Sequence, residues 1–186
     1  MILFDLDMVL CDTTHRRHFI KEPDAWIQNE EFKTNPMMSS FTTNPEWREF
    51  ISDYAAYDNA CDGDEPIKPT IEAMRHMTVP TDNLHIWSSR CESVRDKTEI
   101  WLRDNLPFWF CMLNLKMRPI GNTEPAWKLK EMWLDDHMKW PELAKEAPEG
   151  MIYKRNNLPD FVFDADPDSI AMWKRRGVFC FDCRQG

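Results

Sequence analysis

Short apolar runs alternate along this chain with segments of helical periodicity, and this alternation constrains the fold more than any other feature. Between the second and third runs, the third and fourth, and the fourth and fifth, apolar residues recur at helical spacing. Strands that alternate with helices form βαβ units, in which the strands are parallel and helices cover both faces of the sheet. The sequence therefore predicts an α/β, Rossmann-like fold with a five-stranded parallel sheet flanked by helices. The predicted strands are residues 2–6, 84–87, 110–117, 161–163 and 178–181.

One long stretch interrupts the alternation after the first strand. It contains a convincing helical pattern that begins at Asn44 and Pro45, two residue types that favour the first positions of a helix. We interpret residues 12–69 as a small helical cap. The core would then consist of residues 1–11 and 70–186.

Charge and glycine content exclude several classes of nucleotide-binding protein. Lys and Arg number 23 against 32 Asp and Glu, for a net charge of −9. This balance disfavours a protein that holds nucleic acid on a broad basic face. The five glycines form neither a P-loop nor a G-x-G-x-x-G pattern. Phosphate would have to be bound by side chains, a metal ion and isolated backbone amides.

The remaining composition bears on the compartment. No apolar run approaches the roughly 20 residues that span a bilayer, and the first residues lack the basic and long apolar regions of a signal peptide. We therefore predict a cytoplasmic protein with no membrane partner. Its six cysteines should be reduced. Cys180 and Cys183 form a C-x-x-C pair, but the other cysteines are scattered singly, which favours structural thiols over zinc ligands.

Chemically reactive side chains follow the predicted strands at the point where each ends. Asp5 and Asp7 follow the first strand, Ser88 the second and Asp164 the fourth. Lys128 and Lys130 lie near the start of the helix after the third. The carboxyl ends of parallel strands are where reactive groups meet in open sheets. Crowded carboxylates repel one another unless a cation lies between them, and Mg²⁺ prefers such oxygen ligands. A carboxylate beside a metal can attack phosphorus, with a lysine and a serine binding the phosphoryl oxygens.

Each position also has a purely structural explanation. Acids at Asp166 and Asp168 suit the start of the helix predicted at residues 169–176, because a helix N-terminus favours negative charge. Lys128 and Lys130 can be solvated helix residues. The order of the set favours chemistry: an acidic pair, a hydroxyl, a lysine and an acidic cluster each stand at their own strand or helix edge.

This ordered set resembles the four motifs of the haloacid dehalogenase (HAD) superfamily of phosphatases. The segments that carry the resemblance are FDLDMVL at 4–10, IWSSR at 86–90, RPIGNTEPAWKLK at 118–130 and FVFD at 161–164. It implies that Asp5 is the nucleophile and Asp7 the general acid/base. It also implies that Ser88 and Lys130 hold the phosphoryl group. The implied Mg²⁺ ligands are Asp5, Asp7, Asp164 and Asp168, with Asp166 as the alternative to Asp168.

The chain is most similar to one branch, the 3′-phosphatase domain of phage-type polynucleotide kinases and related phage nucleotidases. Three segments carry this similarity, DTTHRRHFI at 12–20, MRPIGN at 117–122 and MWKRRGV at 172–178. The second segment, together with its distance to the lysines, favours Lys130 over Lys128. We expect substrate contacts by His15, by Arg16 or Arg17, and by Arg90 and Arg118. If the protein is phage-encoded, its compartment would be the cytoplasm of the host cell. The chain departs from the usual pattern in having Met8 where glycine is common and Ala165 next to Asp164.

The cap would select the substrate. Between Asp12 and Lys68 the chain has 12 acidic and six basic residues, a balance that would repel a long polynucleotide. We therefore predict a Mg²⁺-dependent, 5′-nucleotidase-like phosphomonoesterase that hydrolyses nucleoside (deoxy)monophosphates through an aspartyl phosphate, with Trp26, Trp47, Phe19 or His15 stacking on the base. A polynucleotide 3′-phosphatase acting on nucleic-acid ends is the alternative. A catalytically silent HAD-fold binding protein is the alternative of a different class.

Overall fold

The computed structural model describes five stretches of the chain. The described residues are 1–20, 53–77, 84–106, 114–143 and 158–184. They belong to two compact units, a larger one formed by Met1–Asp12 with Glu65–Gly186 and a smaller one formed by Thr13–Asp64. No helix in the described stretches is both long and apolar enough to cross a membrane.

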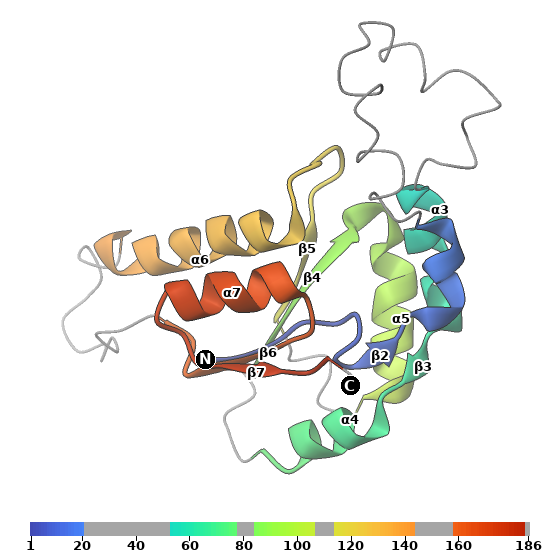
Figure 1. Ribbon diagram of the computed structural model, residues 1–186, viewed down its shortest axis with the longest axis horizontal. Coiled ribbons are helices and arrows are strands. Elements are labelled where there is room, and N and C mark those ends of the chain that lie inside the picture. The colour runs from blue at the N-terminus through green and yellow to red at the C-terminus, as the bar shows by residue number, and fades with distance from the viewer. Residues whose placement is uncertain (21–52, 78–83, 107–113, 144–157, 185–186) are drawn as a thin grey trace, which may run out of the picture. The chain divides into compact units, whose positions relative to one another are not determined.

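A five-stranded sheet with the order β5-β4-β1-β6-β7 forms the centre of the larger unit (Figure 1). Its neighbouring strands are all parallel, which confirms the predicted sheet. The chain runs from β1 outward to β4 and β5, and then returns to β6 and β7 on the other side of β1. The point where this order reverses lies between β1 and β6. The strands are β1 (Ile2–Phe4), β4 (Leu84–Cys91), β5 (Asn114–Arg118), β6 (Phe161–Asp164) and β7 (Cys180–Asp182).

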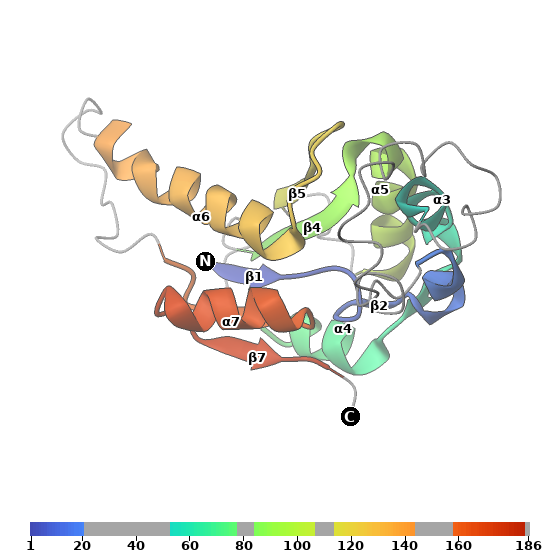
Figure 2. The same cartoon turned by 45° about the horizontal axis from the view of Figure 1, so that its top comes forward.

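Helices cover both faces of this sheet. The α4 and α5 helices pack on the face that includes Phe4 and Ile86. The α6 and α7 helices lie side by side on the opposite face, with Leu3 and Trp87 (Figure 2). Burial on both faces explains why β1 reads as a continuous apolar run instead of an alternating one. The helices are α4 (Lys68–Arg75), α5 (Arg95–Asn105), α6 (Ala126–Leu143) and α7 (Pro167–Arg175), and a short 3-10 turn, Glu92–Val94, precedes α5.

The predicted and observed elements differ mainly at their ends. The β4 strand continues to Cys91, four residues beyond the predicted end, and α4 begins at Lys68, two residues before the predicted core resumes. Residues 110–113 of the third predicted strand lie outside the described residues. A two-stranded antiparallel ladder of β2 (Cys11–Asp12) and β3 (Glu65–Pro66) joins the two chain segments of the larger unit.

The smaller unit is helical where it is described. It contains the 3-10 helix η1 (Thr14–Phe19), the helix α3 (Tyr54–Asn59) and the 3-10 turn η4 (Cys61–Gly63). Arg16 is fully buried here and binds both carboxylate oxygens of Asp64, with Nε–Oδ1 and Nη2–Oδ2 distances of 2.7 and 2.9 Å. The helix predicted to begin at Asn44, and the candidate stacking residues Trp26 and Trp47, lie outside the described residues.

Candidate functional site

Two acids lie at the point where the strand order reverses. Phe4 of β1 is aligned with Phe163 of β6, and the amide of Asp5 donates a 2.8 Å hydrogen bond to the carbonyl of Phe163. This register brings Asp5, just after β1, beside Asp164 at the end of β6. Both residues are buried. Open parallel sheets bind ligands at this point, outside the carboxyl ends of the strands.

Lys130 bridges the two acids. Its Nζ lies 2.9 Å from Asp5 Oδ2 and 2.8 Å from Asp164 Oδ2, and the residue is 1 % exposed. The phase of α6 explains which lysine reaches the acids. Lys130 follows the buried Leu129, whereas Lys128 lies near the surface and pairs with Glu124 at 2.8 Å. The structure therefore brings Lys130, and not Lys128, to the acids.

The pKa values of this cluster reflect burial and crowding. Burial raises the pKa of Asp5 to about 7; Lys130 opposes the rise, and the charges of Asp164 and Asp7 add to it. Burial alone would lower the pKa of Lys130, but Asp164 and then Asp5 outweigh it and the pKa is raised. The lysine is therefore a cation at neutral pH, while Asp5 is close to the point at which it exchanges its proton.

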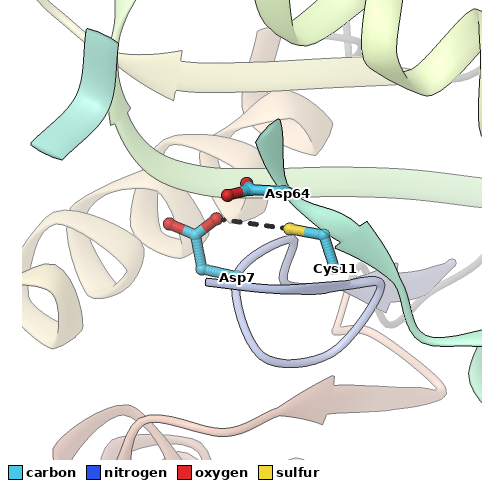
Figure 3. A group of neighbouring side chains, drawn as sticks. All are labelled: Asp7, Cys11 and Asp64. Atoms are coloured by element: carbon cyan, nitrogen blue, oxygen red, sulfur yellow. Dashed lines mark hydrogen bonds between the residues drawn. The ribbon is translucent and has the colours of Figure 1, made fainter. Parts of the chain in front are cut away.

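Asp7 is held by a buried arginine. Arg90 donates to Asp7 Oδ1 through Nε at 2.8 Å and through Nη2. Nη2 also lies 3.0 Å from the sulfur of Cys11, whose thiol faces the same Asp7 oxygen at 3.6 Å (Figure 3). The structure thus places the guanidinium of Arg90 on Asp7. Sequence reasoning missed Cys11, because a lone buried cysteine carries no signal of its neighbours.

A β-bulge in β4 shapes the segment that contains Ser88. Ser88 is paired with Met117 and Cys91 with Arg118, so β4 has two extra residues between these pairs. Such bulges redirect side chains, often next to active sites. Ser88 itself is fully buried, and its Oγ accepts a 3.2 Å hydrogen bond from the amide of Arg90.

Arg118 organises the loop before α6. Its guanidinium donates to the carbonyls of Ser89 at 2.8 Å and Glu124 at 2.6 Å, and to the side chain of Asn122 at 3.1 Å. These contacts tie the end of β4 to residues 119–125, which lead into the helix that carries Lys130. The predicted substrate contact of Arg118 would add to this role.

The other predicted site residues lie in local structure. In the smaller unit, His15 is exposed with Nε2 3.2 Å from the carbonyl of Ala60, and Arg16 is held in its buried pair with Asp64. In the larger unit, Asp166 caps α7 by accepting from the amide and hydroxyl of Ser169 at 2.9 and 2.6 Å. Asp168 is exposed in the first turn of that helix. The roles proposed for these four residues stay predictions.

The loop after β1 contains a strained residue. Met8 has a φ of 61°, the left-handed region that glycine enters freely and other residues enter at a cost. Met8, which stands where glycine is common in the family, therefore occupies a position at which glycine would relieve strain. The loop is held by the amides of Leu10 and Cys11, which donate to the carbonyl of Leu6 at 2.9 and 3.2 Å.

The donors of this cluster fit a hard divalent cation. Asp5, Asp7 and Asp164 provide three carboxylates, against the two positive charges of Lys130 and Arg90. One excess negative charge and carboxylate oxygens as donors match the ligand preference of Mg²⁺.

Comparisons with known proteins show a likeness of fold. No family model matches the chain, and no curated protein matches its sequence. A chain in the solved structure of the Pnkp1/Rnl/Hen1 RNA repair complex superposes with a TM-score of 0.52 at 16 % identity, over 100 % of this chain and 42 % of that one. A second structure, of the Pnkp1/Rnl/Hen1 complex, gives a TM-score of 0.47 at 17 % identity, over 100 % of this chain and 46 % of that one. The protein therefore spans less than half the length of these chains, and the first of them shares its fold.

Proposed function

We propose that this protein is a Mg²⁺-dependent phosphomonoesterase of the HAD type that hydrolyses nucleoside (deoxy)monophosphates. The observation that carries the proposal is the bridge from Asp5 through Lys130 to Asp164 at the carboxyl ends of β1 and β6. A nucleophilic carboxylate must be held beside a cation in a site from which water can be excluded. Here both acids and the lysine are buried, and each comes from a separate element of the core.

The proposed reaction has two steps. The carboxylate of Asp5 attacks phosphorus, the bond from phosphorus to the nucleoside oxygen breaks, and Asp7 gives its proton to that oxygen. Asp7 then takes a proton from water, whose oxygen attacks the phosphorus of the aspartyl phosphate. The bond to Asp5 breaks, which releases phosphate and restores both residues.

The neighbours of these acids have matching tasks. Arg90 binds Asp7 at Oδ1 and would hold this carboxyl group in place for proton transfer. Lys130 and Ser88 would neutralise and bind the phosphoryl oxygens. A bound Mg²⁺ would stabilise negative charge on those oxygens. Its proposed ligands are Asp5, Asp7, Asp164 and Asp168.

The proposed substrate, a mononucleotide, follows from the charge of the segment after β1. The excess of acids in residues 12–68 would repel successive phosphates of a polynucleotide, and one phosphate on a small molecule avoids this repulsion. The second candidate is a polynucleotide 3′-phosphatase. It is favoured by the fold shared with a chain of an RNA repair complex and by the similarity to the phage-type 3′-phosphatase branch. A silent binding protein is the third, and the ionisable groups at the carboxyl ends of the strands disfavour it.

One experiment separates these candidates. Phosphate release would be measured from 5′- and 3′-mononucleotides and from 3′-phosphorylated oligonucleotides, with and without Mg²⁺. We expect Mg²⁺-dependent release from mononucleotides that Asp5→Asn abolishes. The same exchange at the exposed Asp104 is the matched control and should leave release unchanged. Release that survives Asp5→Asn would refute the mechanism, release from oligonucleotides alone would select the second candidate, and no release from any substrate would select the binding protein.

A further inference from the structure

Asp164 is held by more donors than the lysine alone. Its Oδ2 accepts from Lys130 Nζ at 2.8 Å and from the indole Nε1 of Trp173 at 2.9 Å, and its Oδ1 accepts from the amide of Asp166 at 3.0 Å. A carboxylate has about four lone-pair sites for such bonds. Within the described residues, therefore, both sites on Oδ2 are used and one remains on Oδ1.

Trp173 is itself fixed in place. It is 0 % exposed and lies 6.1 Å from the ring of Trp87, within the core between the sheet and α6 and α7. The C-terminus of its helix is capped by a 3.0 Å hydrogen bond, which the amide of Val178 donates to the carbonyl of Trp173. The left-handed φ of Gly177 allows this cap. A buried indole in a closed helix end presents its N–H in one direction. Its partner carboxylate is therefore held in one orientation.

We infer that Trp173 is a positioning residue for the metal and phosphoryl site. The indole N–H occupies Oδ2 of Asp164 beside Lys130, and so leaves Oδ1 as the oxygen available to a metal ion. Removal of the N–H leaves one lone pair on Oδ2 without a donor. The carboxylate of Asp164 can then rotate, and Lys130 is held less firmly beside Asp5. Partners of this kind behind a metal ligand orient it and tune its affinity.

The inference rests on the proposed function, since it assigns Asp164 to a metal site. It adds a residue that a sequence reading assigns to the core, because a Trp at a buried helical position needs no further explanation. The hydrogen bonds from Trp173 and from the Asp166 amide to Asp164 are local contacts, because these three residues all lie within ten residues of one another at the end of β6 and in the α7 segment. It needs no residue of the smaller unit.

The test uses the whole 186-residue chain and two ways of removing the N–H. Trp173→Phe removes it together with part of the ring. Replacing the indole of Trp173 by benzothiophene, through an unnatural amino acid, removes the N–H and keeps the two-ring shape. Trp133→Phe is the matched control, since Trp133 is buried in the same core and contacts Trp87. In the described part of the chain its indole binds no carboxylate.

Two readouts are needed. Mg²⁺ affinity would be measured by calorimetry without substrate, and kcat and KM would be measured at saturating Mg²⁺. We expect both Trp173 variants to lose about 10- to 100-fold in Mg²⁺ affinity or kcat, with little change in KM, as is typical for residues behind a metal ligand. Trp133→Phe should change neither quantity, although it lowers the unfolding temperature.

The outcomes distinguish this inference from the proposed function. If the wild-type protein binds Mg²⁺ and releases phosphate while the benzothiophene variant matches it in both readouts, the positioning role is refuted and the function stands. If Trp133→Phe is as impaired as Trp173→Phe, general packing explains the loss and the inference also fails. If the wild-type protein itself neither binds Mg²⁺ nor releases phosphate, the proposed function is what fails.

Discussion

The stability of the Asp5→Asn variant relative to wild type should rise as the pH increases from about 4 to about 8. The fold raises the pKa of Asp5 from 3.8 to about 7, mainly through burial. An acid whose pKa is raised by folding binds its proton more tightly in the folded state. The stability that this proton contributes is complete below the unfolded pKa, falls as the pH rises from about 3.8 towards 7, and is absent above that range.

The size of the effect follows from the same shift. About three pKa units correspond to about 4 kcal/mol of unfolding free energy. This is the cost of keeping Asp5 ionised in its buried position, after its pairing with Lys130 is included. Asparagine has nearly the same shape and no proton to lose. The difference in stability between Asp5→Asn and wild type should therefore change by up to about 4 kcal/mol between pH 4 and pH 8, in favour of the variant at high pH.

Urea unfolding in EDTA, followed by tryptophan fluorescence at several pH values, would measure this difference. The other acids are present in both proteins, so subtraction leaves the contribution of Asp5 together with its interactions with Lys130 and Asp164. Asp104→Asn, an exchange of the same kind at an exposed position, is the control. A flat or opposite difference for Asp5→Asn would refute the buried, crowded environment derived for Asp5. Added Mg²⁺ should reduce the effect, because a cation beside the carboxylate favours its ionised form.

Three further substitutions test other parts of the larger unit. Met8→Gly should be about 1 kcal/mol more stable than Met8→Ala in urea unfolding, since only the alanine variant keeps a Cβ at a positive φ; equal stabilities would contradict the strain. Arg90→Lys should lower the unfolding free energy by about 1–3 kcal/mol, because a point charge cannot make both bonds of the guanidinium to Asp7; an unchanged value would show that this pairing contributes nothing. Arg118→Ala should speed amide hydrogen exchange in residues 119–125, where the exposed Arg103→Ala should not; slow exchange in both would show that other contacts order the loop.

The sheet and its two central acids could be predicted because simple rules govern them. Each strand is an apolar run, since helices bury both of its faces, and parallel strands align their carboxyl ends. That alignment places Asp5 beside Asp164 without any knowledge of side-chain rotamers. The residues themselves left both Lys128 and Lys130 open. The phase of α6 resolves the pair, because Lys130 continues the buried face that Leu129 begins.

The contacts around the acids could not be predicted in this way. Arg90 is predicted to contact substrate, and nothing in the sequence signals its pairing with Asp7, which is 83 residues away. Arg90 lies in the bulge of β4, and that bulge depends on pairing between two strands. The hydrophobic pattern places Trp173 in the core but does not indicate the direction of its indole N–H. Such contacts depend on rotamers and on distances between elements, and hydrophobic periodicity contains neither.

The charges of the site imply that phosphate binding needs an added cation. Lys130 is positive, but it lies between two carboxylates and is already offset by them. The charge of Arg90 is likewise offset by Asp7. With Asp5, Asp7 and Asp164 all ionised, the five side chains together have one excess negative charge and would repel a phosphate dianion, whereas a divalent ion reverses the sign of the whole group. A chain with five glycines has no Gly-rich loop to take over this task with backbone amides. We therefore expect metal dependence, because both buried cations of the site are paired with its own acids.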